Sequence, residues 1–138
     1  MKSSRDRSRT TNPEREISPM SNITEQLEAL VAVDGAMCAA LVDSSSGMVL
    51  GTAGSGLDLD VAAAGNTEVV RAKLNTVKSL GLNDHIEDIL ITLTTQYHII
   101  RPLATTPEVF IYLVLDTAKS NLALARIKVK EADSHLVL

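Results

Sequence analysis

The residues that can carry chemistry are few and lie far apart in the chain. His85, His98 and His135 have no second ligand at the spacing that a zinc site requires. Cys38 is the single cysteine, and its neighbours Met37 and Ala39 predict a packed thiol that is not a nucleophile. We interpret each histidine as a surface or hydrogen-bonded side chain and predict no metal site.

Four aspartates, Asp34, Asp43, Asp58 and Asp60, stand close enough in sequence to suggest paired carboxylates. Each lies at an expected turn or helix start, where a carboxylate accepts backbone N–H groups. The glycine-rich segment 51–56 (GTAGSG) lacks the lysine of a Walker loop and has the wrong glycine order for a dinucleotide site. The sequence therefore predicts no catalytic residues and no cofactor, and we expect the chain not to be an enzyme.

Composition indicates one globular domain in a reducing compartment. The chain has 138 residues, of which 45% are hydrophobic and 22% charged. Aromatic residues are limited to Tyr97, Phe110 and Tyr112, which leaves little material for stacking on bases. The longest apolar run, 109–115, is far below the roughly 18 residues that span a bilayer. We expect a cytoplasmic protein without membrane insertion.

The first twenty residues differ in kind from the rest. They carry five basic and three acidic side chains and few large apolar ones, which predicts a disordered tail at 1–20. Three interpretations are open: a solvated tail, a segment that binds nucleic acid or an anionic membrane, or residues upstream of a true start at Met20. Residues 21–138 have eight basic and fourteen acidic side chains, which disfavours nucleic-acid binding by the domain.

Periodicity predicts eight elements in the order α-β-β-α-β-β-β-α. Short hairpin connections favour antiparallel pairing, so the expected fold class is α+β, with one five-stranded antiparallel sheet covered by helices. The last helix is expected to turn its Ala118, Leu122, Ala125 and Val129 inward. The expected ranges are a helix from 21 to the turn at 33–36, strands 36–43 and 48–53, a helix 57–80, strands 87–94, 97–104 and 108–116, and a helix 118–133.

Four segments in this order resemble the roadblock/dynein light chain family. They are VDGAMCAALVDSSSGMVLGTA for the first hairpin, LDVAAAGNTEVVRAKL for the long helix, DILITLTTQYHIIRPL for a strand pair, and FIYLVLDTAKSNLALARIKV for the last strand and helix. The match is one of pattern and covers about residues 22–135.

The resemblance implies a non-enzymatic adaptor. Members of the family form homodimers, or heterodimers with a paralogue, in which sheets join edge to edge and the long helices pack together. Bacterial members commonly accompany a small Ras-like GTPase, as co-regulator or GTPase-activating partner, often beside a sensor-kinase-like protein. The implied function is GTPase regulation or scaffolding in a signalling or polarity system, with any nucleotide held by the partner.

Two groups of residues are predicted to form a dimer interface. Ala62, Gly65, Val69 and Ala72 make a strip of mostly small residues on the long helix, suited either to another helix or to close packing on its own sheet. We favour the first interpretation.

The second group is Asp88, Leu90, Thr92 and Thr94, which share one face of strand 87–94. That strand follows a long connection and lacks Pro and Lys, so an open edge there would invite pairing with another chain.

Arg101 and the absence of a site leave two further alternatives. Arg101 is a lone charge before Pro102 in an apolar strand. It either points to solvent or pairs with a nearby carboxylate, which we favour, or acts as an arginine finger toward a GTPase.

The alternative function is a PAS- or profilin-like sensor of a small ligand, which requires a pocket that the composition does not suggest.

Overall fold

The computed structural model describes residues 19–138, so the predicted tail at 1–20 lies outside the described residues except for its last two positions. One sheet has the strand order β2-β1-β5-β4-β3, with every neighbouring pair antiparallel. The predicted element order and α+β class are confirmed. The elements are α2 (Pro19–Val31), β1 (Ala36–Asp43), β2 (Met48–Gly54), α3 (Leu59–Ser79), β3 (Ile89–Thr92), β4 (Gln96–Pro102), β5 (Val109–Asp116) and α4 (Leu122–His135).

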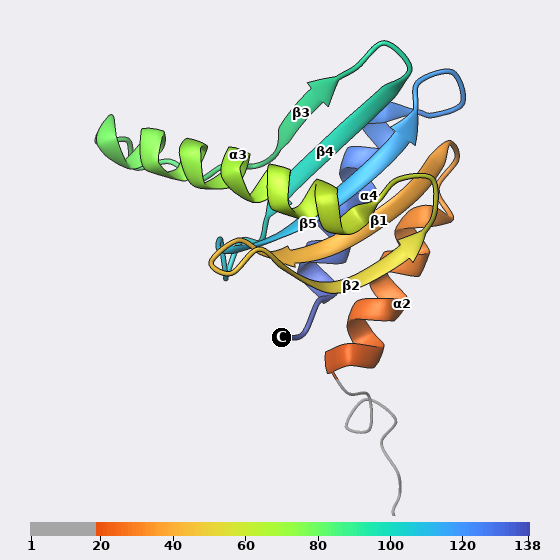
Figure 1. The fold of residues 1–138 in the computed structure, drawn as a ribbon, viewed down its shortest axis with the longest axis horizontal. Helices are drawn as coiled ribbons and strands as arrows, with labels where there is room; N and C mark the ends of the chain where they lie inside the picture. Colours follow the sequence, from red (N-terminus) through yellow and green to blue (C-terminus); the bar gives the residue numbers. More distant parts are fainter. Residues whose placement is uncertain (1–18) are drawn as a thin grey trace, which may run out of the picture.

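The sheet lies between unequal helical layers. Helices α2 and α4 pack on one face through Leu27, Ala125 and Val129, whereas α3 packs on the other through Ala63 and Val70. Figure 1 shows α3 crossing in front of the sheet, with the β3–β4 hairpin extending past it. One helix therefore leaves part of its face of the sheet without helical cover.

Strand β5 lies at the centre of the sheet and contributes to both cores. Phe110 and Tyr112 face the α3 layer, while Ile111 and Leu113 face α2 and α4. Successive side chains of a strand point to opposite faces, so a central strand covered on both sides must be apolar throughout. This explains why 109–115 is the most hydrophobic run of the chain.

Helix α3 begins and ends as the sequence predicts. The Asp58 carboxylate accepts hydrogen bonds from the N–H groups of Asp60 (3.1 Å) and Val61 (3.2 Å). At the other end Gly81 has a φ of 67°, its N–H donates to the Lys78 carbonyl, and the next N–H donates to the carbonyl of residue 77. This is a Schellman motif, and the left-handed conformation favours glycine.

The last helix begins four residues later than predicted. The Asp116 carboxylate accepts the Ala118 N–H at 2.8 Å, which holds 117–119 in a turn, and Asn121 then caps the helix by accepting the Leu124 N–H at 3.1 Å. Ala118 is therefore exposed and was wrongly placed on the inner face. Ala125 and Val129 are buried as expected.

Helix α2 begins at Pro19, two residues before the predicted domain boundary, so the division of the chain into tail and domain stays a prediction. Among the described residues no helix is long and apolar enough to cross a membrane.

Candidate assembly interface

Strand β3 is one edge of the sheet. It pairs with β4 alone, through the register Ile89 with Ile100 to Thr92 with Tyr97. The strand spans only Ile89–Thr92, shorter than the predicted 87–94, so Asp88 and Thr94 lie just outside it. The predicted edge is present and is shorter than expected.

The backbone of β3 offers hydrogen-bonding groups to a neighbour. The Leu93 N–H donates to the Gln96 carbonyl at 2.8 Å, which makes this a hydrogen-bonded pair next to the hairpin turn. Because such pairs alternate along an antiparallel ladder, Leu90 and Thr92 direct their N–H and C=O groups away from β4. The Thr92 side chain is exposed, and Leu90 packs partly into the α2–α4 core.

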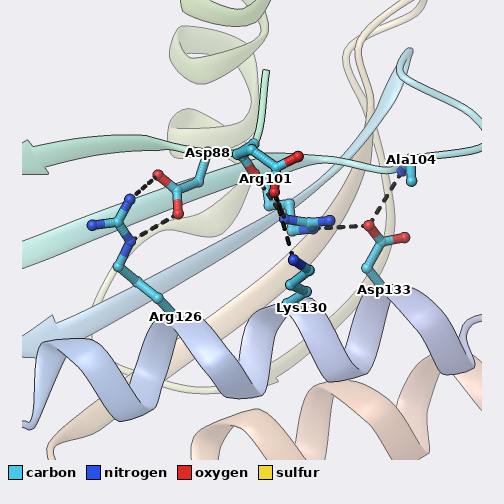
Figure 2. Close-up of polar contacts among 7 residues, drawn as sticks. Asp88, Arg101, Ala104, Arg126, Lys130 and Asp133 are labelled. Atoms are coloured by element: carbon cyan, nitrogen blue, oxygen red, sulfur yellow. Dashed lines mark hydrogen bonds and ion pairs between the residues drawn. The ribbon is translucent and has the colours of Figure 1, made fainter. Parts of the chain in front are cut away.

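The residue before β3 is held by α4. Arg126 donates to both Asp88 carboxylate oxygens, from Nε at 2.9 Å and Nη2 at 2.7 Å (Figure 2). This bidentate geometry is the strongest arrangement for such a pair, and Asp88 raises the pKa of Arg126. The carboxylate of Asp88, predicted to belong to the interface, is thus already engaged within the chain.

Arg101, on β4, also holds the residues just before β3. Its Nε donates to the Asp133 carboxylate at 2.8 Å and its Nη1 to the Glu87 carbonyl at 2.9 Å. The Asp133 oxygen also accepts the Ala104 N–H at 3.2 Å, as Figure 2 shows, and Lys130 lies 3.8 Å from the Glu87 carboxylate. The arginine side chain is only 10% exposed. It pairs with a carboxylate, as favoured, and its buried contacts do not leave it free to act as an arginine finger.

These ion pairs tie the connection between α3 and β3 to α4. The partners Arg126 and Asp133 were missed in the sequence because they stand 38 and 32 residues from Asp88 and Arg101. No local spacing could have indicated them. They link the residues just before the edge strand to α4 and, through Arg101, to β4.

Only two of the four residues in the predicted strip on α3 are exposed. Ala62 and Val69 are half-buried and pack on the α3-side core, whereas Gly65 and Ala72 are exposed. A Cβ built on Gly65 would have no heavy atom within 4 Å, apart from its chain neighbours and the nearby backbone of its own helix. The small size of Gly65 is therefore not required by packing within this chain.

A hollow lies beside the exposed part of α3. It has a volume of about 390 Å³ and lies between the first half of the helix and the strands β4 and β5. Ala62 and Gly65 line it from the helix, and His98 and Tyr112 line it from the sheet. His98 was interpreted as a surface or satisfied side chain, and it is satisfied by contacts to Gln96 and Tyr112.

Other reactive groups do not converge. Within residues 19–138 no three His, Cys, Asp or Glu side chains gather as a metal-binding group. Cys38 is buried, and burial raises the pKa of its thiol, which disfavours the thiolate. A second hollow, beside Arg101 and the end of α3, has a volume of only about 150 Å³, below the usual range for a ligand pocket.

No protein-family profile matches the sequence, and no curated protein matches it as a relative. Solved structures do match. MglB of Myxococcus xanthus aligns with a TM-score of 0.75 at 20% identity, over 85% of this chain and 86% of that one. A structure described as MglB with tetrameric arrangement aligns at 0.73 and 22%, over 86% and 88%. A roadblock/LC7 domain from Streptomyces avermitilis aligns at 0.69 and 12%, over 80% and 90%. The chain has the roadblock/LC7 fold, as the sequence resemblance indicated.

Proposed function

We propose that this chain is a dimeric, non-enzymatic adaptor that regulates a small Ras-like GTPase in a signalling or polarity system. The observation that carries the dimer is the open β3 edge, where Leu90 and Thr92 direct unpaired backbone groups outward on a roadblock fold. An edge strand of this kind is a template for another strand.

A two-fold axis beside β3 accounts for both predicted groups of interface residues. Antiparallel pairing of β3 with its copy continues the sheet through two chains, since the same edge serves both. The uncovered part of the α3 face then lies next to the same region of the second copy. Gly65 and Ala72 are exposed there and small enough for a second helix to approach closely. Ala62 and Val69 flank that contact.

The dimer is tested by replacing one outward N–H. Thr92→Pro removes a donor that β4 does not use, so the fold should persist while pairing between copies is lost. Thr92→Val is the matched control, because it keeps the N–H and changes the same exposed side chain. Light scattering should give twice the monomer mass for the wild type and Thr92→Val, and the monomer mass for folded Thr92→Pro. A wild-type monomer would overturn the homodimer.

A heterodimer with a paralogue is the other form of the same assembly. It predicts a wild-type chain that is monomeric alone and dimeric after co-expression with a roadblock-type paralogue from the same genome. Thr92→Pro should then abolish that complex as well. A monomeric wild type that also fails to pair with any such paralogue would overturn edge-to-edge assembly.

The GTPase is the partner that the family resemblance implies, and the acidic domain disfavours nucleic acid as an alternative. Each small Ras-like GTPase of the same genome, loaded with GDP or a non-hydrolysable GTP analogue, should be tested for binding to the dimer by calorimetry. The GTP hydrolysis rate of a GTPase that binds then separates an activating partner, which raises the rate, from a scaffold, which leaves it unchanged. Absence of binding to all of them would overturn this part of the proposal.

The sensor-kinase-like partner stays an expectation from the family alone, since none of the similar structures named above is described as a kinase.

A further inference from the structure

A line of polar side chains crosses the otherwise apolar α3 face of the sheet. His98 on β4 lies with Nε2 at 2.8 Å from Gln96 Oε1 and with Nδ1 at 2.9 Å from the Tyr112 hydroxyl on β5. The two rings meet edge to face, with centroids 5.4 Å apart. The Gln96 amide nitrogen contacts the Met37 sulfur at 3.8 Å. The imidazole is therefore held at both nitrogens.

The chemistry of these partners assigns the proton positions. The Gln96 Oε1 atom can only accept, so His98 Nε2 carries the proton and donates to it. The unprotonated Nδ1 then accepts from the Tyr112 hydroxyl. The His98 N–H and the Tyr112 O–H each meet an acceptor while His98 is neutral. A second proton, on Nδ1, would face the tyrosine O–H, so the bond to Tyr112 must reverse or be given up while the bond to Gln96 is kept.

The surroundings of His98 offer little compensation for a positive charge. Across the ladder it faces Ile91 on β3 and Val114 on β5. Asp58, the cap of α3, is the charged residue among those that line the hollow, and its carboxylate already accepts two backbone N–H groups at the start of the helix. Burial lowers the pKa of His98 in the single chain.

Two further groups on neighbouring elements act on Tyr112. Burial raises its pKa, the Asn66 amide on α3 lowers it in part, and Cys38 on β1 raises it. The hydroxyl is therefore a neutral donor over the physiological range. Among the residues that line this hollow, Asp58 is the only charged side chain that could accept a hydrogen bond in place of His98.

We propose that His98 is an acid-sensitive switch in the dimer interface, so that a proton on its Nδ1 separates the two copies. The inference rests on the proposed function, because the hollow that holds His98 is lined by Ala62 and Gly65 of the strip assigned to the second copy. When the second copy covers this hollow, the water that would solvate an imidazolium is removed.

The sign follows from linkage. Because cover by a second copy lowers the pKa of His98 further, the dimer binds fewer protons than two separate chains. Dimer stability is then fully present above the His98 pKa of the separate chain and is lost as the pH falls through it. Two copies of His98 set an upper limit of about 100-fold in the dissociation constant per pH unit. We expect the dissociation constant to rise, within this limit, as the pH is lowered from 7.5 to 5.5.

The test is a dilution series of the full chain by sedimentation velocity at both pH values. His98→Asn keeps an acceptor for the Tyr112 hydroxyl and cannot titrate, so its dissociation constant should change less than about twofold. The double variant with His85→Asn and His135→Asn, both at exposed positions, is the matched control and should keep the full wild-type response. A wild-type constant that does not change with pH, or a His98→Asn response equal to it, would overturn the switch.

NMR of the wild-type imidazole gives a second reading that needs no variant. The neutral form should be protonated at Nε2, and its pKa should be lower in the concentrated dimer than in the folded Thr92→Pro monomer. Equal pKa values in the two states, or protonation at Nδ1 in the neutral form, would overturn the switch even if His98→Asn failed to fold. A dimer without pH response refutes the switch alone, whereas a chain that is monomeric at pH 7.5 refutes the proposed assembly itself.

Discussion

Gly65 provides the sharpest test of whether the strip on α3 serves this chain or a second one. A Cβ at this position would have no heavy atom within 4 Å apart from its chain neighbours and the nearby backbone of its own helix, and the residue is exposed in the interior of a 21-residue helix. In a single chain, Gly65→Gln should therefore raise the free energy of unfolding by about 0.5 kcal/mol, because glutamine is a much better helix former than glycine.

In the proposed dimer the same substitution should have the opposite effect. A side chain inserted where two helices approach costs about 1–3 kcal/mol, and the two-fold axis applies it twice. The dissociation constant should then rise by a factor of roughly 30 or more, from a loss of about 2–6 kcal/mol.

Both effects can be measured on one protein. Urea denaturation in the monomeric Thr92→Pro background gives the stability of the single chain, and sedimentation with otherwise wild-type sequence gives the dissociation constant. Ala64→Gln is the control, since residue 64 is exposed on the same helix and outside the strip.

The two measurements refute the reasoning in different ways. A Gly65→Gln chain that is less stable than wild type would show that Gly65 packs on its own sheet. A more stable chain with an unchanged dissociation constant would place the interface elsewhere.

Three further substitutions test the contacts within the domain. Arg101→Met leaves the buried Asp133 carboxylate without its cation, so the free energy of unfolding measured in urea should fall by about 3–5 kcal/mol. The control Lys128→Met, at an exposed position, should lose less than about 0.5 kcal/mol. A loss below about 1 kcal/mol for Arg101→Met would contradict the buried pair. Asp58→Ala removes the cap of α3 and should cost about 1 kcal/mol by the same assay, while no loss would mean that water replaces the cap. Hydrogen bonds from Ser45 lower the pKa of Asp43, so the stability advantage of wild type over Asp43→Asn should be present at neutral pH and shrink as the pH falls below about 4, and an advantage independent of pH would contradict this.

Local pattern accounts for the elements and their order. The seven apolar residues of β5 predict a strand covered on both faces, and Asp58 and Gly81 mark the two ends of α3, because hydrophobic spacing and capping act over only a few residues. The same reasoning predicted the open edge from a long connection and the absence of blocking residues in 87–94. It failed at Ala118, whose N–H donates to the Asp116 carboxylate and so lies in a turn that helical spacing alone does not reveal.

Tertiary structure decided which distant residues meet. The pairing of β1 with β5 places β2 and β3 at the two edges, and this order leaves β3 with β4 as its one neighbouring strand. Packing of α4 on the sheet brings Arg101 into contact with Asp133, and strand register brings His98 beside Tyr112. In the sequence His98 was one of three isolated histidines. The proposed role of His98 depends on Tyr112, which lies 14 residues away in the sequence and is brought beside it by strand pairing.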